Sequence, residues 1–489
     1  MNRRGFIRSM TAFGAATGLP GCATLSAVGG PELKVGVLSD IHIMGPETAT
    51  YFERALVYFR AKGADAVVIA GDMADYGLVP ELQNVADVWY KVFPDDKLPD
   101  GRHVEKVFVY GNHDHHAYMW KSATTGERWT GADYERVFNL SIAKDPAAAW
   151  RKCFREDYAQ VTAKTVKGYT FIAAHWDTPG GIPAVKEFMA KTGPSLDGSK
   201  PFFFCQHQHP KDTCLPFAPH DSGIATTALS PFPNAIALSG HAHQPLTDER
   251  NIWQGAFTSI GTASLKNVGG RNWRENGAPY AAGLSKAAHM PDVRGEDCRQ
   301  GLFMRVYKDR IEVERRDFFY GLPVGADWRI PWPLSRGRPF AFEARAAATG
   351  KAEFAPGAEV HLEVKDGETD AGEPMKRLVV SFPPAAGKGR VYDYEVEARL
   401  EEEDVVRTVA SKRVMAPDYY LPDAKKGLPG EAWFALCELP EKARLRFAVS
   451  PLNCFGAKGA PIFTSALWKQ EKLMSHGDSA KPKTKKGTP

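Results

Sequence analysis

A short apolar run that leads directly into reactive side chains constrains this sequence more than any other feature. The run is Val107–Tyr110, and Gly111, Asn112, His113 and Asp114 follow it. An apolar run of this length, bounded by a turn, indicates a buried strand. Polar groups just past it then lie at the strand's carboxyl end, and in open α/β sheets ligands bind at that edge. The sequence therefore predicts a binding site there, if other strands bring matching groups to the same edge.

Other predicted strands are followed by similar groups. These strands and the residues after them are Lys34–Ser39 with Asp40 and His42, Ala66–Ala70 with Gly71, Asp72 and Asp75, Pro201–Cys205 with His207 and His209, and Ala235–Leu238 with Gly240, His241 and His243. Any one such motif is common in turns, and an aspartate after a strand is often a helix cap. A series of them, each placed after an apolar strand, is hard to explain as caps alone.

The spacing between the strands predicts an α/β sheet. Glu47–Lys62 and Pro80–Val92 have helical periodicity, so the first three strands form a βαβαβ unit with parallel strands and right-handed crossovers. Tyr169–Ala174 is a further predicted strand. Gln300–Tyr307 and Arg310–Arg316 are expected to form a hairpin that closes this domain. We place the domain at residues 31–320.

The composition changes after this domain. Residues 321–338 are rich in proline and glycine, which indicates a linker. Apolar and polar residues then alternate in Val360–Lys365, Tyr392–Leu400 and Leu445–Val449, so residues 339–470 are predicted to form an all-β sandwich. This part weakly resembles a fibronectin type III-like module. The lysine-rich residues 471–489 are predicted to be a disordered tail.

Taken together, the motifs resemble those of the calcineurin-like metallophosphoesterase superfamily. Their order is DxH, GDxxD, GNHD, a histidine after a strand, and GHxH, and the resemblance covers about Leu33–Asp317. It implies an αββα four-layer fold, in which a β-sandwich is flanked by helices. It also implies two divalent metal ions at the shared strand edge.

The resemblance further implies a set of ligands. Asp40, His42 and His243 would hold one ion, Asn112, His241 and the histidine after the Pro201–Cys205 strand would hold the other, and Asp72 would bridge both. We favour His207 over His209 as the strand-end ligand, because a ligand must lie close to the strand end where the sheet holds it. Nitrogen and oxygen ligands without thiolate suit Fe, Mn or Zn. Asp75 stands where purple acid phosphatases carry a metal-binding tyrosine, so a purple Fe(III) centre is not expected.

These roles predict a phosphoesterase. A metal-activated hydroxide would attack phosphorus in line, and His113 would protonate the departing oxygen as general acid. Asp75 would hydrogen-bond His113, orienting it and holding it protonated. The expected substrate is a phosphorylated small molecule or a nucleotide. Monoester, diester and nucleotide pyrophosphate substrates stay open, and so does a catalytically silent binding protein on the same fold.

The overall charge argues against one class of partner. The net charge is +4 over 489 residues, and part of it comes from the lysine-rich tail. It therefore gives no support to nucleic-acid binding. The sequence contains 7 cysteines in no CxxC pair, so it predicts neither a zinc ribbon nor a disulfide connectivity, and it does not indicate an oligomeric state.

Residues 1–30 are interpreted as an export signal. Arg3 and Arg4 precede Phe6-Ile7 and a modestly apolar stretch, which resembles a bacterial twin-arginine signal. Leu19–Cys22 also resembles a lipoprotein cleavage box with Cys22 as the lipidated residue. Pro20 departs from the small residue usual at that position, so lipidation and its absence both stay open. We expect a protein of the bacterial cell envelope or periplasm.

Replacing Arg3 and Arg4 with lysine should trap the precursor in the cytoplasm, because the export receptor reads the arginine pair. Immunoblotting of cell fractions measures this effect. The matched control is Arg8→Lys, which keeps the charge and the pair and should be exported normally. Unaffected export of the double variant would contradict the signal.

Overall fold

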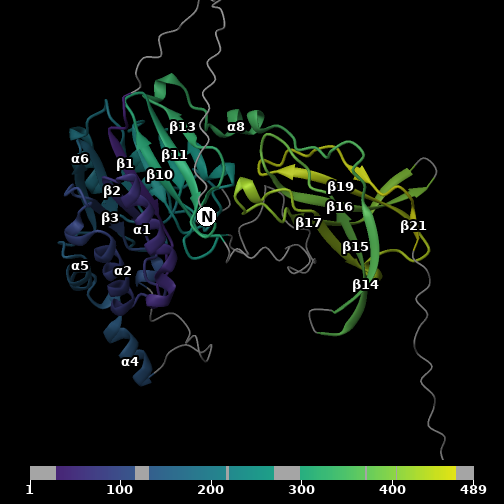
Figure 1. The fold of residues 1–489 in the computed structure, drawn as a ribbon, viewed down its shortest axis with the longest axis horizontal. Helices are drawn as coiled ribbons and strands as arrows, with labels where there is room; N and C mark the ends of the chain where they lie inside the picture. The colour runs from purple at the N-terminus through teal and green to yellow at the C-terminus, as the bar shows by residue number, and fades with distance from the viewer. Residues whose placement is uncertain are drawn as a thin grey trace, which may run out of the picture.

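The computed structural model describes residues 29–115, 131–215, 220–268, 298–368, 372–402 and 405–469 (Figure 1). The twin-arginine segment, Cys22 and the lysine-rich tail lie outside these residues. None of the helices in the described ranges is long and apolar enough to cross a membrane. Cys153, Cys205, Cys214, Cys298, Cys437 and Cys454 are all free thiols.

The first sheet contains the predicted βαβαβ unit. Its strands are β1 (Leu33–Leu38), β2 (Ala66–Ala70), β3 (Glu105–Val109), β10 (Gln300–Val306), β11 (Arg310–Asp317), β12 (Leu322–Pro323) and β13 (Trp328–Pro331). They lie in the order β12-β11-β10-β1-β2-β3, with β13 beside β11. β1, β2 and β3 are parallel, and β10 and β11 form a hairpin, as predicted. β10 also pairs antiparallel with β1.

The second sheet is also mainly parallel. Its strands are β4 (Val161–Val166), β5 (Tyr169–Ala174), β6 (Phe202–Cys205), β7 (Ala235–Ser239), β8 (Ile252–Gln254) and β9 (Thr258–Gly261), in the order β4-β5-β6-β7-β9-β8. β5, β6, β7 and β9 run parallel to one another. Their carboxyl ends therefore lie at one edge of this sheet.

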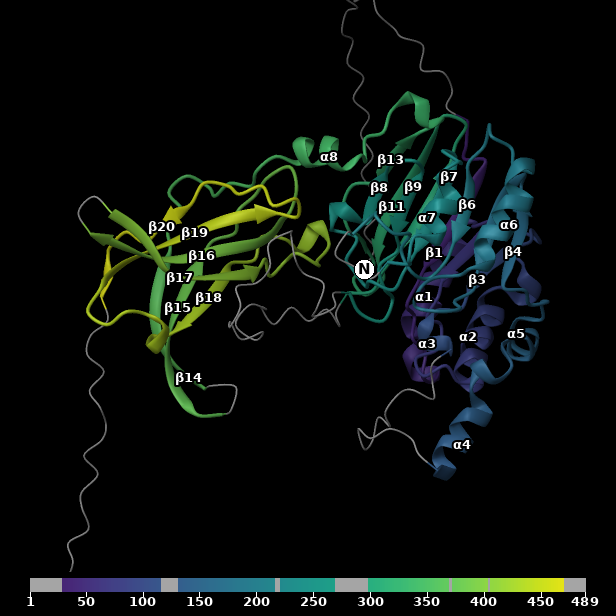
Figure 2. The same ribbon diagram turned by 180° about the vertical axis from the view of Figure 1, so that it is seen from behind.

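Helices cover the outer face of each sheet (Figure 2). α1 (Thr50–Lys62), α2 (Val79–Val92) and α5 (Pro146–Phe154) pack on the first sheet, and α6 (Ala184–Thr192) and α7 (Ile224–Leu229) pack on the second. Strand side chains alternate between faces, so Val68 points into the core between the sheets and Val67 points towards α1 and α2. The four-layer αββα arrangement is confirmed. The remaining described helices are α3 (Asn112–His115), α4 (Gly131–Leu140) and α8 (Phe342–Thr349).

The C-terminal part contains the predicted β-sheets, but the predicted all-β range of 339–470 also includes the helix α8 near its start. One sheet contains β14 (His361–Glu368), β15 (Pro374–Phe382) and β18 (Gly430–Ala435). The other contains β16 (Val391–Glu402), β17 (Val405–Met415), β19 (Arg444–Asn453), β20 (Ile462–Phe463) and β21 (Trp468–Lys469). We call residues 361–469 the β-domain and residues 31–331 the αββα domain.

The predicted proline-rich linker at residues 321–338 is the main difference from the sequence analysis. Most of it is β-structure, because β12 and β13 both pair with β11. Trp328 and Ile330 are buried against the central core, while Pro331 ends the strand at the sheet edge, where a missing N–H costs nothing. The core of the αββα domain continues into the β-domain without a break.

Candidate metal centre

The two sheets bring the predicted ligands together because their carboxyl-terminal edges meet. The loops after β1, β2 and β3 face the loops after β6 and β7, and hydrogen bonds join them across the sheets. His207 Nδ1, after β6, donates to the main-chain oxygen of Ala70 at the end of β2 over 2.8 Å. The main-chain N–H of His241 donates to Asp40 Oδ2 over 2.9 Å. Each ligand loop is therefore held by the opposite sheet.

One group of acceptor atoms is formed by Asp40, His42 and His243, whose candidate ligand atoms lie within 4.8 Å of one another. His42 Nδ1 donates to the carboxylate of Asp75, and His243 Nδ1 donates to the main-chain oxygen of Asn267. These bonds fix the tautomers, so both Nε2 atoms present lone pairs, and they lie 3.3 Å apart. Asp40 Oδ1 is buried 3.0 Å from His243 Nε2, and it has no other hydrogen-bond partner within the described residues.

A second group is formed by Asp72, His207 and His241. With Nδ1 donating to Ala70, the other nitrogen of His207, Nε2, faces the site. It lies 3.1 Å from Asp72 Oδ2 and 3.1 Å from His241 Nδ1. The amide oxygen of Asn112 is also buried, and the described part of the chain offers it no hydrogen-bond partner. Buried acceptors are normally satisfied, so a cation is the partner that these atoms fit.

Asp72 lies between the two groups. Its Oδ1 accepts a hydrogen bond from the main-chain N–H of His113 over 2.8 Å. Its Oδ2 lies 3.1 Å from His207 Nε2 and 3.7 Å from His42 Nε2, so one oxygen faces both groups. This is the position of a carboxylate that bridges two ions. The donor set of carboxylate, imidazole and amide oxygen fits Fe, Mn or Zn and contains no thiolate.

The electrostatics favour a positive charge at this point. Burial raises the pKa of Asp40 and Asp72, but the neighbouring histidines outweigh it and hold both pKa values below their usual range. Burial likewise disfavours charge on His207, but Asp72 and Asp40 raise its pKa to about 9. The carboxylates therefore hold a proton on His207 when no ion is bound. A metal ion would replace that proton, as metal binding generally does.

Backbone strain is concentrated at the ligands. Asp40, His42, Asp72, His241 and His243 all have positive φ, between 45° and 69°. This left-handed region is uncommon for residues other than glycine, and it persists only where the surroundings impose it. The chain therefore holds its ligand side chains in place at a conformational cost that the rest of the fold must offset.

Two motif glycines are explained by close approach. A Cβ atom on Gly71 would lie 2.4 Å from His207 Nδ1, and Gly71 also has a φ of +91°. A Cβ atom on Gly240 would lie 1.7 Å from Ser39 Oγ and 2.4 Å from Asp40 Oδ2. Any side chain at either position would displace a ligand or its support. The site therefore requires glycine at both positions, directly before Asp72 and His241, for steric reasons.

The predicted contact between Asp75 and His113 needs a correction. His113 Nδ1 donates to the main-chain oxygen of Asp75 over 2.8 Å, whereas the Asp75 carboxylate accepts from His42 and from Lys266 Nζ, at 2.9 and 2.6 Å. These partners lower the pKa of Asp75 to about 2 despite its burial. Asp75 therefore orients His113 through its backbone and orients the ligand His42 through its side chain.

The sequence analysis missed the loop after β9. Its main-chain N–H groups at Leu265 and Lys266 donate to the carbonyl oxygens of Ser39 and Asp40, and Asn267 supplies the carbonyl that orients His243. Lys266 Nζ, partly exposed, anchors Asp75. β9 has few apolar residues and no metal-ligand motif after it. Its parallel pairing with β7 is what places this loop at the common edge.

The structure separates the alternative histidines. His209 is buried with Nδ1 3.2 Å from Cys214 Sγ, its ring packs against that of His220, and it belongs to none of the acceptor groups found in the described residues. His175 accepts a hydrogen bond from the main-chain N–H of Tyr110, and burial lowers its pKa to about 3. It is therefore a packed neutral histidine.

Comparison with protein families identifies the αββα domain. Residues 33–245 match the family described as calcineurin-like phosphoesterase. That segment includes the five motifs from Asp40 to His243, and the fold around it is the one that the family resemblance implied. These residues are therefore similar to a calcineurin-like phosphoesterase domain, and the match does not extend to the β-domain. No curated protein matches the chain.

Several solved structures are similar at low identity. A dimetal phosphatase from Danio rerio is 11% identical with a TM-score of 0.35, over 62% of this chain and 99% of that one. GAP50, the anchor in the inner membrane complex of Plasmodium, is 13% identical with a TM-score of 0.34, over 61% and 88%. Zn²⁺-bound Vps29 from Entamoeba histolytica is 9% identical with a TM-score of 0.27, over 61% and 99%.

His207→Ala should remove one metal ion, because it deletes a nitrogen that faces Asp72 Oδ2. His209→Ala is the matched control, since it truncates a histidine two positions away that hydrogen-bonds Cys214 instead. Metal content per chain, measured by mass spectrometry of the purified protein, distinguishes them. Retention of both ions in His207→Ala together with loss in His209→Ala would reverse the assignment.

Proposed function

We propose that this protein is an exported phosphoesterase that uses two divalent metal ions. Asp40, His42 and His243 would hold one ion, and Asn112, His207 and His241 would hold the other. Asp72 would bind both. The observation that carries the proposal is that Asp72 Oδ2 lies 3.1 Å from His207 Nε2 of one acceptor group and 3.7 Å from His42 Nε2 of the other. A cation is the partner that both groups fit, because each brings carboxylate and imidazole acceptors together. The calcineurin-like phosphoesterase domain supports the same reaction class.

When bound, a pair of ions at such a site supplies a Lewis acid for phosphate oxygens and lowers the pKa of a shared water. The chain itself would hold the metal ligands at fixed positions and protonate the leaving group. The His42 side chain is fixed by Asp75, and His207 by the Ala70 carbonyl. Such supporting bonds orient ligands and usually matter nearly as much as the ligands themselves.

His113 is positioned to protonate the leaving oxygen. Its Nδ1 donates to the Asp75 carbonyl, so Nε2 is the nitrogen that we propose to face the leaving group. Its ring stands edge-on to that of His42, with the centroids 4.4 Å apart, and it shares an acceptor group with His42 and Asp72. A substrate phosphate bound between the ligand groups would lie within reach of His113. General acid catalysis is the role that we propose for it.

Two other functions stay as alternatives to a monoesterase. The same centre would also suit diesters or nucleotide pyrophosphates, because we expect the segments 120–157 and 246–299 to select the ester, and each lies partly outside the described residues. A catalytically silent binding protein is the second alternative. The complete set of ligands, with both acceptor groups intact, favours the enzyme over the binding protein. The Arg3-Arg4 pair supports the proposed export.

Asp72→Ala should abolish hydrolysis, because it removes the oxygen that lies 3.1 Å from His207 Nε2 in one acceptor group and 3.7 Å from His42 Nε2 in the other. We expect at least a hundredfold loss, on the order of what the loss of a supporting residue at a metal site already costs. The measurement is turnover of a chromogenic phosphate monoester and its diester with added Mn²⁺. Preference for one ester narrows the substrate class.

The control for this experiment is Asp309→Ala, which replaces an exposed aspartate in the β10–β11 turn and should leave turnover unchanged. No turnover with both ions bound would point to a more demanding phosphate ester. No turnover and no bound metal would contradict the proposal and favour the binding protein.

His113→Ala should lower turnover by about 10²–10⁴-fold for esters whose leaving alcohol needs a proton. The loss should be much smaller for esters with acidic leaving groups such as nitrophenol, because these depart as anions. Turnover of a series of esters, plotted against the pKa of the leaving alcohol, measures the effect. Equal losses across the series would show that His113 does not act as the general acid, and a loss of bound metal would make it a ligand.

A further inference from the structure

The loop that carries His241 and His243 needs support beyond the two sheets. It runs from Gly240 to Asn251, and both histidines are held at positive φ, 69° and 50°. A residue other than glycine keeps such a positive φ only where surrounding contacts impose it. Its first supports are local: Asn251 Nδ2 donates to the carbonyl oxygens of Gln244 and Pro245, directly after His243.

Gln300 supplies the next support and connects the loop to the β-domain. This residue is fully buried at the start of β10, and its Oε1 accepts the main-chain N–H of Leu246 over 2.7 Å. Its Nε2 donates to the main-chain oxygen of Tyr420 in the β-domain over 2.9 Å. Its own N–H donates to the carbonyl oxygen of Ser264, in the loop after β9. One amide side chain thus joins the ligand loop to the β-domain.

The other end of the ligand loop also contacts the β-domain. Arg250, buried, forms two bonds to Asp248 and lies over the ring of Tyr392, 4.9 Å from its centroid. Tyr392 is fully buried and packs against Tyr419 in the same domain. A guanidinium held between a carboxylate and an aromatic face is strongly positioned, because the cation–π attraction is larger in a desolvated setting.

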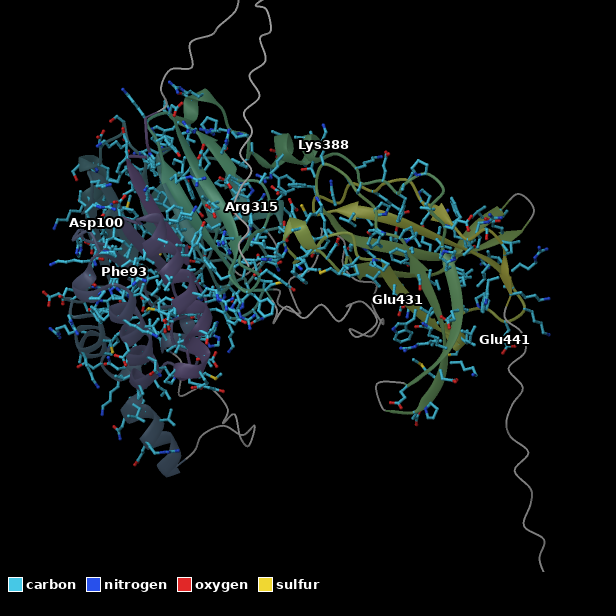
Figure 3. All side chains as sticks on the ribbon, viewed as in Figure 1. Phe93, Asp100, Arg315, Lys388, Glu431 and Glu441 are labelled. Atoms are coloured by element: carbon cyan, nitrogen blue, oxygen red, sulfur yellow. The ribbon has the colours of Figure 1, made fainter. Side chains whose placement is uncertain are left out.

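Glu249 completes the contact. It forms ion pairs with Arg315 on β11 and with Arg345 on α8, the helix that lies between the two domains in Figures 1 and 2. Figure 3 labels Arg315 where the domains meet, and its Nη1 also donates to the carbonyl oxygen of Leu246 over 2.7 Å. Residues 246–250 are therefore enclosed by β11, α8 and the β-domain.

We propose that the β-domain helps to hold the metal centre together, because it supports the loop that carries His241 and His243. The Tyr420 carbonyl supports this loop through Gln300. The Tyr392 ring supports it through Arg250. The inference rests on the proposed function only in taking these histidines as metal ligands. Tyr392 and Gln300 are positioning residues that touch neither ion nor substrate. A ligand loop needs such fixed support, because small displacements of a ligand weaken binding steeply.

The test compares Tyr392→Leu with Tyr392→Phe in the full-length protein. The leucine variant loses the ring beneath Arg250, and the phenylalanine variant keeps it. We expect the dissociation constant for Mn²⁺, measured by titration without substrate, to rise about 10- to 100-fold in Tyr392→Leu and to stay near the parent value in Tyr392→Phe. Amide exchange of residues 244–251 in the metal-free protein should quicken in the leucine variant, while α6 stays unchanged.

Phe434→Leu is the control for general damage to the β-domain, because it truncates a fully buried ring on β18 that packs against Phe447, within the sandwich. Gln300→Glu tests the second link: it retains the acceptor for Leu246 and places an oxygen against the Tyr420 carbonyl. It should weaken Mn²⁺ binding to a similar extent, and it keeps the proposal testable if Tyr392→Leu does not fold.

Parent-like Mn²⁺ affinity and amide exchange in folded Tyr392→Leu and Gln300→Glu would overturn the proposal. An equal loss in Phe434→Leu would also overturn it, because the effect would then not depend on the contact. These readouts need no substrate. A parent protein that binds two ions but cleaves no phosphate ester would contradict the proposed function and leave this inference standing.

Discussion

The close approach of buried imidazole nitrogens and carboxylate oxygens is the constraint on which this structure depends. The Nε2 atoms of His42 and His243 face each other at 3.3 Å, and Asp40 Oδ1 faces His243 Nε2 at 3.0 Å. Left uncompensated, such a group would separate or take up protons. The fold prevents separation by using every other polar atom of these side chains in hydrogen bonds to the opposite sheet or the next loop. What remains is an arrangement that a multiply charged cation satisfies.

The supporting contacts explain features that otherwise look unrelated. Motif glycines allow one loop to pass against another, ligands adopt left-handed backbone angles, and carbonyl oxygens such as that of Ala70 select imidazole tautomers. The hydrogen bonds among these features contribute only modestly to the stability of the fold. Each residue with a left-handed backbone conformation lowers that stability by about 1–3 kcal/mol. Burial of the continuous hydrophobic core offsets this cost, and that core extends from the space between the two sheets into the β-domain. The centre and the second domain are thus linked by packing as well as by hydrogen bonds.

The sequence predicted the parts of the fold that strong local signals encode. Apolar runs such as Ala66–Ala70 and Tyr169–Ala174 form strands with the expected bounds, and the motif order located the strand ends that meet. The prediction of a linker at residues 321–338 was wrong for most of that range. Proline and glycine also occur in edge strands, and β12 and β13 are such strands. Lys266 and Gln300 carry no local signature. Their importance comes from which strands are neighbours, and pairing between distant strands is a tertiary property.

The position of β1 in the first sheet has a consequence for synthesis. β1 is paired on one side with β2, which follows it closely, and on the other with β10, so that Leu33 lies opposite Val306. A nascent chain therefore exposes one edge of a central strand until most of the αββα domain has been made. Pairings this distant in sequence form slowly and leave edges open to association. The first sheet is consequently completed only after residue 306 has been made, and a chaperone that shields β1 would protect its open edge until then.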